Sequence, residues 1–435
     1  MKDVIDRSGS GKPTFPEQVT FMNLPRMQTI RQTPRVPALA DPALEVRSQL
    51  RRLPLRDRLC AGDTVAVTVG SRGIANIAAI TGELVAELRA CGTRPFIIPA
   101  MGSHGGGTAE GQRSIVEGFG ITEQTMGVPI KSSMDVAQIG RTPEDIPVFV
   151  DRHALAADHI AVVGRIKPHT DFSGEVESGL HKMMVIGLGK HRGAALYHKT
   201  FVRYGFDHMI KSIAGVILEK CPILLGLAIV ETPDDATGLI RALWPEDFAS
   251  SEPALLAKAR EWMPRLPFSR ADLLIIDAIG KDISGTGLDT NVVGRNPAAP
   301  GQGPRITRIY VRGLTPGTHG NATGMGFADY THRRLVDEID YQTTRINCLT
   351  GNNPRAGAIP LHFDSDRGAI EAALGTVGYI APAMARVMRI RHTLDLAEVQ
   401  VSEAYTQELA RRPYLAAVSP PAEPAFDEND NLLPF

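Results

Sequence analysis

Short apolar runs alternate with glycine-containing turns and amphipathic stretches along much of the chain. The pattern predicts strands at 64–69, 95–99 and 159–163. Helical patterns follow the first two runs, over 74–90 and from 108 onward. A strand, a glycine-containing turn and a helix, repeated in this way, are typical of an α/β fold with a parallel sheet.

A second unit of the same kind begins with the apolar run at 272–279, and helical patterns at 330–341 and 365–374 fit it. A stretch over 253–266, interrupted by two prolines, predicts a linking helix. We therefore expect two α/β domains, residues 1–265 and 266–435, with an active-site cleft between them. Residues 1–50 are expected to be mostly an extended arm, and the proline-rich tail a disordered or docking segment.

Three polar turns follow the three predicted strands of the first unit: GSRG, GSHGGG and GRIKPH. In open α/β sheets, ligands bind beyond the carboxyl ends of the strands, so these turns are expected at the ligand-binding edge. GSRG could offer backbone N–H groups to a phosphate, with Arg72 as the counter-charge. None of the turns matches the dinucleotide fingerprint or the P-loop pattern.

Composition and charge narrow the function. The 435 residues include 47 Lys and Arg against 48 Asp and Glu, so no global field attracts nucleic acid or an anionic membrane. Four widely spaced cysteines form no CxxC pair, which argues against a zinc ribbon. No apolar stretch is long enough to span a bilayer, and the N-terminus lacks the apolar core of a signal peptide. We therefore expect a soluble, cytoplasmic enzyme, and a homo-oligomer stays open.

Histidine is concentrated in one part of the sequence. Six of the twelve histidines lie between His153 and His198, and a segment starting at Lys167 mixes them with lysines and glycines. Such a segment could hold an anion, a metal or a set of acid–base groups, or it could be a surface loop with scattered histidines. The spacings match neither the HExxH motif nor a zinc site built with cysteine.

The order of these motifs resembles the nickel-dependent lactate racemase family. The resemblance covers about residues 60–400 and is carried by SRG after the first strand, GSHGG after the second, and KPHTDFSG, GLHKMM and YHK after the third. It implies a nickel-pincer nucleotide as cofactor, a pyridinium-3-thioamide-5-thiocarboxylate mononucleotide that binds Ni. It also implies dependence on the enzymes that synthesise this cofactor.

The resemblance assigns roles to individual residues. His104 and His169 stand at the places of the two catalytic bases, and Lys182 at the place of the lysine that is bonded to the cofactor. His198, sixteen residues later, stands where the family has its nickel ligand. Gly70, Ser71 and Arg72 fit the basic turn beside the cofactor phosphate or the substrate.

Some alternatives stay open. His181 or His191 could replace His169 or His198, and Lys182 and Lys190 could be phosphate contacts only. The acidic residue that usually precedes the arginine of the first turn is Val69 here, which leaves the local cofactor contacts in doubt.

The second half departs from the lactate-specific members of the family, whose aromatic, amide and lysine trio is missing from residues 281–295. The polar candidates there for substrate binding are Lys281, Asp282, Asn291 and Arg295. Arg295 could bind a carboxylate in bidentate fashion or form a structural ion pair. We therefore expect a 2-hydroxy acid other than lactate, such as a malate-like dicarboxylate or a sugar acid.

The expected activity is racemisation or epimerisation at C2 of a 2-hydroxy acid by hydride transfer, with two histidines as acid and base. One rival is a hydroxy-acid oxidoreductase that uses the same cofactor or a nicotinamide. The missing GxGxxG counts against the nicotinamide. A second rival is a non-catalytic carrier of the cofactor, which would need Lys182 and His198 but neither His104 nor His169.

Overall fold

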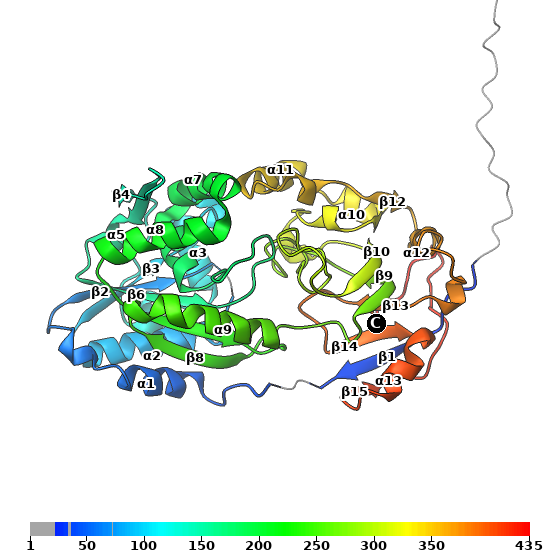
Figure 1. Cartoon of the computed structure of the whole chain (residues 1–435), viewed down its shortest axis with the longest axis horizontal. Helices are drawn as coiled ribbons and strands as arrows, with labels where there is room; N and C mark the ends of the chain where they lie inside the picture. Colours follow the sequence, from blue (N-terminus) through cyan, green and yellow to red (C-terminus); the bar gives the residue numbers. More distant parts are fainter. Residues whose placement is uncertain (1–21, 34–35, 72) are drawn as a thin grey trace, which may run out of the picture.

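The structure is a computed structural model, and it describes residues 22–33, 36–71 and 73–435. Two α/β domains lie side by side (Figure 1). The five strands of the N-terminal sheet are, in spatial order, β3 (Arg94–Pro99), β2 (Thr64–Val69), β6 (His159–Arg165), β7 (Ile223–Glu231) and β8 (Thr237–Leu243). The first four are parallel and β8 is antiparallel. A two-stranded ribbon, β4 (Val136–Arg141) and β5 (Pro147–Asp151), stands apart from this sheet.

The strand order of this sheet fixes where a ligand can bind. The chain runs from β2 outward to β3 and then returns to place β6 on the other side of β2. The order therefore reverses next to β2, which makes a topological switch point between β2 and β6. In doubly wound sheets the ligand crevice lies beyond the carboxyl ends of the strands at such a point. The residues that follow these two strands are Gly70 and Ile166.

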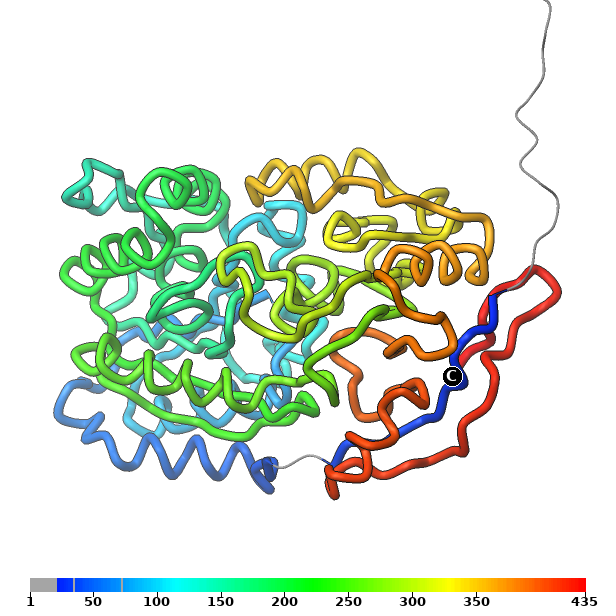
Figure 2. The backbone as a smooth tube through the Cα atoms, turned by 45° about the vertical axis from the view of Figure 1, so that its right-hand side comes forward, coloured from blue at the N-terminus to red at the C-terminus, as the bar shows by residue number. Residues whose placement is uncertain are grey.

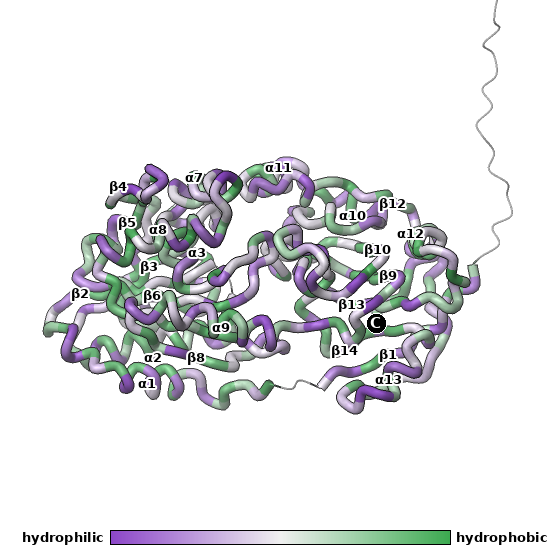
Figure 3. The backbone as a smooth tube through the Cα atoms, viewed as in Figure 1, coloured by the Kyte–Doolittle hydropathy of each residue, from purple (hydrophilic) through white to green (hydrophobic). Residues whose placement is uncertain are grey.

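Both faces of the N-terminal sheet are covered by helices. Val65 and Val67 pack with residues of α1 (Pro42–Arg51) and α2 (Ile77–Ala90), whereas Ala66 and Val162 pack with the other layer. Strands buried on both faces read as continuous apolar runs, which is why β2 was predicted with its observed bounds. Figure 3 shows α1 alternating between hydrophobic and hydrophilic positions, as expected of a surface helix.

The second layer of helices on this sheet is formed by α7 (Leu188–Tyr204), α8 (Phe206–Lys220) and α9 (Phe248–Trp262). The short helices are α3 (Ala109–Gly118), α4 (Glu123–Met126) and α5 (Arg152–Leu155). The segment from α6 (Leu180–Lys182) continues through a π-helical turn, η3 (Met183–Gly187), into α7 (Leu188–Tyr204), which is kinked at Lys190. π-Helical turns occur often at functional sites.

The C-terminal domain is built on an eight-stranded sheet. In spatial order its strands are β12 (Leu361–Phe363), β11 (Tyr330–His332), β10 (Arg305–Val311), β9 (Arg270–Ile276), β13 (Val387–Ile390), β14 (Glu398–Ser402), β1 (Met27–Gln32) and β15 (Leu415–Ala417). Its helices are α10 (Arg333–Asp337), α11 (Tyr341–Thr350), α12 (Asp366–Leu374) and α13 (Thr406–Ala410). The helical pattern predicted over 330–341 therefore starts as strand β11 and turns helical only at α10.

Strand β1 corrects the sequence-based division at residue 265. The sequence places all of residues 1–265 in the first domain, but β1 pairs with β14 and β15 of the second sheet. The chain thus begins its described part in the C-terminal domain and crosses to the N-terminal domain before α1. It returns between the end of α9 at Trp262 and the start of β9 at Arg270. A strand of six residues among polar neighbours has too little periodicity to reveal such a long-range pairing.

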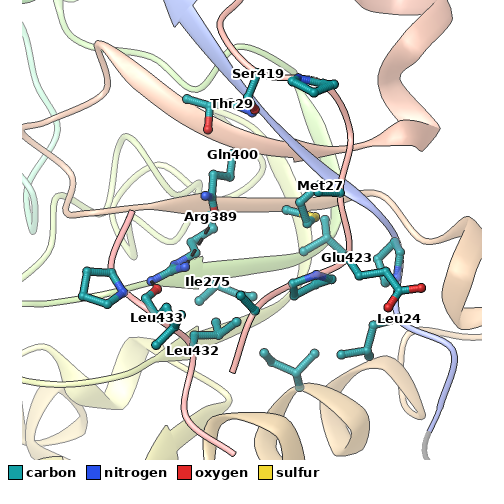
Figure 4. Close-up of a pocket in the computed structure, with 18 residues that line it drawn as sticks. Leu24, Met27, Thr29, Ile275, Arg389, Gln400, Ser419, Glu423, Leu432 and Leu433 are labelled. Carbon is teal, nitrogen blue, oxygen red and sulfur yellow. Dashed lines mark hydrogen bonds between the residues drawn. The ribbon is translucent and has the colours of Figure 1, made fainter. Parts of the chain in front are cut away.

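The proline-rich tail is docked on the C-terminal domain, where it runs beside β1 (Figure 2). Leu432 N–H donates to Asp366 at 2.8 Å, and the Leu432 carbonyl accepts from Arg312 at 2.7 Å. Between this tail and the sheet lies a largely apolar cavity of about 330 Å³, with Arg389 and Gln400 on its polar side (Figure 4). Among the described helices, none combines the length and apolar character that a membrane crossing needs.

Candidate active site at the domain contact

The turns that follow β2 and β3 pack on the helical segment 180–204. A Cβ added to Gly70 would lie 2.9 Å from Cε of Met183, and one added to Gly102 would lie 2.9 Å from Cβ of Ala194. At Gly102 a side chain would push the turn away from the helix, because the Cβ of Ala194 is fixed, whereas at Gly70 the flexible Met183 side chain would have to move. The turns predicted at the ligand-binding edge thus meet the kinked helical segment that carries Lys182 and His198.

His104 lies at the tip of the turn after β3, directly before the short helix η2 (Gly105–Gly107). The fully buried side chain of Gln112, on α3, stabilises this turn. Its Nε2 donates to the carbonyls of Met101 at 3.0 Å and Gly102 at 2.9 Å. The half-buried His104 is therefore presented on a fixed backbone.

His169 lies in the loop after β6, at the switch point of the sheet. Its Nδ1 accepts a hydrogen bond from the backbone N–H of Asp171 at 3.0 Å, so the neutral ring carries its proton on Nε2. The ring stacks on Phe172 with centroids 4.7 Å apart, and Phe172 stacks in turn on Phe206 at 4.6 Å. The orientation of the His169 ring is thus set by one hydrogen bond and an aromatic wall.

His198 lies against the same aromatic wall, with its centroid 6.4 Å from that of Phe172. Its Nδ1 donates to the carbonyl of Ala194 at 2.6 Å, since a carbonyl oxygen only accepts. The lone pair of the neutral ring is therefore on Nε2. Burial lowers the pKa of His198 below its ordinary value, and the positive charge of Lys182 lowers it further. This is the protonation state that a metal ligand needs.

Asp171 interacts with polar and charged residues of both domains. Its Oδ1 accepts a hydrogen bond from Asn353, which follows α11 in the C-terminal domain, at 3.1 Å. Burial raises the pKa of Asp171, whereas Asn353 and the charges of Lys182 and Lys281 act in the opposite direction. Lys182 from the first domain and Lys281 from the second are thus close enough to act on one carboxyl group.

Two of the alternative candidates, His181 and Lys190, are buried side chains. His181 is buried, and its Nδ1 lies 2.8 Å from Oε2 of Glu252, a fully buried residue of α9. Lys190 is also fully buried, where its Nζ donates to the carbonyl of Pro99 at 2.6 Å and lies 3.5 Å from Asp151. Both are part of the core of the N-terminal domain.

His191 is exposed on α7 beside the turn after β3, because a Cβ on Gly107 would lie 2.6 Å from its Nδ1. It belongs to the rim of the region that holds His104. Of the residues predicted for the cofactor phosphate, Gly70 and Ser71 directly follow β2 at the switch point. Arg72 lies outside the described residues.

The four substrate-binding candidates of the second half lie in different surroundings. Lys281 stays in the site, where its Nζ donates to Asn347 at 2.7 Å and to the carbonyl of Gly285. Asp282 is exposed and accepts from Thr315 at 2.5 Å. Arg295 takes the structural alternative, with an ion pair to Asp329 at 3.1 Å. Asn291 donates to the backbone carbonyl of His169 at 3.1 Å, so it contacts the site through the main chain.

A cavity of about 1200 Å³ lies between the domains, on the side of the linker 263–269. Its lining includes Glu177 and Asn291 but, among the described residues, none of His104, Lys182 and His198. The candidate site therefore lies at the domain contact, and this cavity lies behind the loop that carries His169.

Several residues of the site were not predicted. Asp171 and Phe172 lie within the motif that carries the resemblance, and their position two and three residues after His169 was the available signal. Asn353 gave none, because it is an isolated amide 182 residues from its partner.

Comparisons with known proteins concern the fold and the N-terminal part of the chain. Residues 21–205 match the family model described as the lactate racemase N-terminal domain. The fold is similar to the lactate racemase apoprotein from Thermoanaerobacterium thermosaccharolyticum, with a TM-score of 0.52 and 13% identity, over 84% of this chain and 94% of that one. Among curated proteins, none matches the sequence. The similarity to the lactate racemase N-terminal domain is thus confined to residues 21–205, and the structural match shows a shared fold.

Proposed function

We propose that this protein is a racemase or epimerase that acts at C2 of a 2-hydroxy acid and holds a nickel-pincer nucleotide. The single observation that carries the proposal is the pairing of His198 and Lys182 on one helical segment. His198 is a neutral imidazole with its lone pair on Nε2. The positive charge of the Lys182 amine lowers the pKa of this imidazole.

The residues present fit such a cofactor. His198 would supply the protein ligand to nickel through Nε2, a borderline donor that suits this metal. Lys182 would supply the amine for a covalent bond. The described residues hold no group of three His, Cys, Asp or Glu side chains that could coordinate an ion by themselves. The other donors would therefore come from the bound cofactor, which would supply a hydride acceptor for C2 of the substrate.

The two histidines would handle the proton of the substrate hydroxyl, one on each side. His104 is presented by the turn after β3 and His169 by the loop after β6. His169 donates from Nε2 in its neutral state. To accept the hydroxyl proton at Nε2, the neutral ring would first have to change tautomer, with its proton leaving Nε2 and Nδ1 becoming protonated, and this would break the hydrogen bond from the Asp171 N–H. That backbone bond therefore controls when His169 acts as a base.

Lys281 would bind the substrate carboxylate, because it is the cation that the C-terminal domain brings toward Asp171 and Lys182. We keep a substrate other than lactate in this proposal. The segment after β9 supplies hydroxyl and amide groups and lacks the lactate-type trio. Cofactor-synthesis enzymes are the partners that the proposal requires.

The test is turnover by the cofactor-loaded protein, produced together with the enzymes that make the cofactor. A single enantiomer of each 2-hydroxy acid is incubated in deuterated water, and chiral chromatography with mass spectrometry follows inversion and deuterium at C2. The proposal predicts inversion with the C2 hydrogen retained. Deuterium at C2 contradicts hydride return, net formation of keto acid indicates the oxidoreductase, and a loaded but inert protein indicates the carrier.

A further inference from the structure

Both polar atoms of the His169 backbone are bound by side chains, and these side chains come from different domains. The N–H of His169 donates to Oε2 of Glu177 at 2.5 Å. Its carbonyl accepts from Nδ2 of Asn291 at 3.1 Å and from Nδ2 of Asn296 at 3.0 Å. Glu177 belongs to the N-terminal domain and the two asparagines to the C-terminal domain.

The Glu177 side of this arrangement is rigid. Glu177 is buried, and its second oxygen accepts from the N–H of Gly174 at 3.1 Å and from Nη2 of Arg260 at 2.6 Å. Arg260, on α9, also donates to the carbonyl of Gly174 at 3.0 Å. Glu177 therefore holds this loop within its own domain, whereas the carbonyls of His169 and Thr170 and the side chain of Asp171 accept hydrogen bonds from the C-terminal domain.

The orientations of the Asn291 and Asn296 amide groups are fixed by their hydrogen bonds. The two hydrogens of Asn296 Nδ2 go to the His169 carbonyl and to Oδ1 of Asn291, 2.7 Å away. Asn296 Oδ1 accepts from the N–H of Ala298 at 2.9 Å, which fixes the amide orientation. Asn291 donates its own hydrogen to the same carbonyl. A single carbonyl thus receives two donors whose orientations are set by other bonds.

We propose that Asn291 and Asn296 are positioning residues through which the C-terminal domain places His169. The inference rests on the proposed function for the role of His169 in proton transfer. The carbonyl that they hold is attached to the Cα of His169, so the position of the ring follows the position of the amides. A displacement near 1 Å at a reacting group reduces turnover strongly, by about 10²-fold.

The interdomain cavity explains how this contact can be reversible. Glu177, Asn291 and Asn296 all line that cavity, so water can reach the polar groups when the domains separate. Buried amides without water access would resist opening, because each unpaired group is costly. Separation of the domains at this contact would therefore leave these polar groups accessible to water.

The test compares Asn291→Ala and Asn296→Asp with the matched control Thr290→Val. Thr290 makes a neighbouring interdomain bond, from its hydroxyl to the carbonyl of Thr170 at 2.5 Å, without touching His169. In the cofactor-loaded protein, each asparagine variant should lower kcat by about 10- to 100-fold with KM changed much less. The control should leave kcat within about twofold of the parent.

A second measurement is independent of activity. Hydrogen exchange at the backbone amide of His169 and the rate at which diethyl pyrocarbonate modifies the His169 ring should both rise in the asparagine variants by about tenfold, and stay unchanged in Thr290→Val. Unchanged exchange and modification in Asn291→Ala overturn the proposal, whatever the kinetics, and so does an equal effect of the control. If Asn296→Asp does not fold, Asn291→Ala alone decides. If the parent protein racemises no hydroxy acid, the proposed function fails while the exchange measurement still decides the positioning.

Discussion

His198 donates its Nδ1 proton to the carbonyl of Ala194, 2.6 Å away on the preceding turn of α7. A histidine so bound is oriented before any ligand arrives, because rotating the ring would break the bond. The hydrogen bond also fixes the tautomer, which is the role that backbone carbonyls play behind many metal-binding histidines. The hydrogen bond within α7 therefore fixes the ring of His198 with its lone pair on Nε2.

The first prediction concerns the protonation of His198. In the protein without cofactor, the ring should titrate below the ordinary value of 6.5, since burial and the charge of Lys182 both favour its neutral form. Lys182→Met should raise this pKa, because a positive charge is removed, whereas Lys182→Arg should not. NMR titration of the ring measures both. A titration above 6.5 in the parent protein would show that burial is not the main effect.

The second prediction separates the metal ligand from the proton-transfer groups. His198→Ala should lower the nickel content of the loaded protein while its circular dichroism stays unchanged. His104→Ala and His169→Ala should keep nickel and lose turnover by roughly 10²–10⁴-fold, the usual contribution of a positioned acid–base group. Nickel analysis and steady-state kinetics decide this. Equal loss of nickel in all three variants would contradict the division of roles.

The third prediction concerns the covalent bond to the cofactor. Peptide mass mapping of the loaded protein should find the adduct on Lys182 and an unmodified Lys190. Lys190 is fully buried and donates to the carbonyl of Pro99, so its amine is not accessible to a cofactor. Lys182→Arg is the control, since it keeps the charge and removes the nucleophilic amine. An adduct on Lys190, or full activity without any adduct, would refute the assignment.

The strands around the site could be predicted from the sequence because they are buried on both faces. β2 has its predicted bounds, and β6 starts at the predicted His159. Thr108 and Ser365 were read as helix starts, and each caps its helix by accepting from a backbone N–H three residues later. These bounds are determined by residues close in the sequence, so a local pattern is enough to predict them. The pairing of β1 with β14 is set about 370 residues away, and no local pattern contains it.

The same distinction holds within the site. The turns that carry His104 and His169 follow apolar strands, so their place at the sheet edge could be inferred. The partners that hold them could not. Glu177, Asn296 and Asn353 are polar residues in irregular segments, where no periodicity distinguishes a buried side chain from an exposed one. Their role depends on how the two domains meet, which composition and spacing do not encode.

The fourth prediction tests the structural role of His181. Its side chain and that of Glu252 are 5% and 1% exposed, and the two form a buried pair at 2.8 Å. His181→Ala should lower the free energy of unfolding by about 3–5 kcal/mol, because it leaves the buried Glu252 with the backbone N–H of residue 181 but without the imidazole. The double variant His181→Leu with Glu252→Met should recover most of this loss in denaturant titrations. Loss of nickel from the folded His181→Ala protein would contradict a purely structural role.

The last prediction concerns substrate choice and Lys281. A site that pairs with substrate hydroxyl groups rejects analogues that lack them, because its own polar groups would be left buried and unpaired. We therefore expect poor turnover of lactate and better turnover of a dicarboxylate or of a polyhydroxy acid. Lys281→Met should raise KM for every substrate, since the carboxylate is common to all of them, and Arg295→Met should leave KM unchanged because Arg295 is paired with Asp329. A panel of D- and L-hydroxy acids with both variants measures these effects. Lactate as the best substrate would contradict the specificity, and a raised KM in Arg295→Met alone would move the carboxylate site to Arg295.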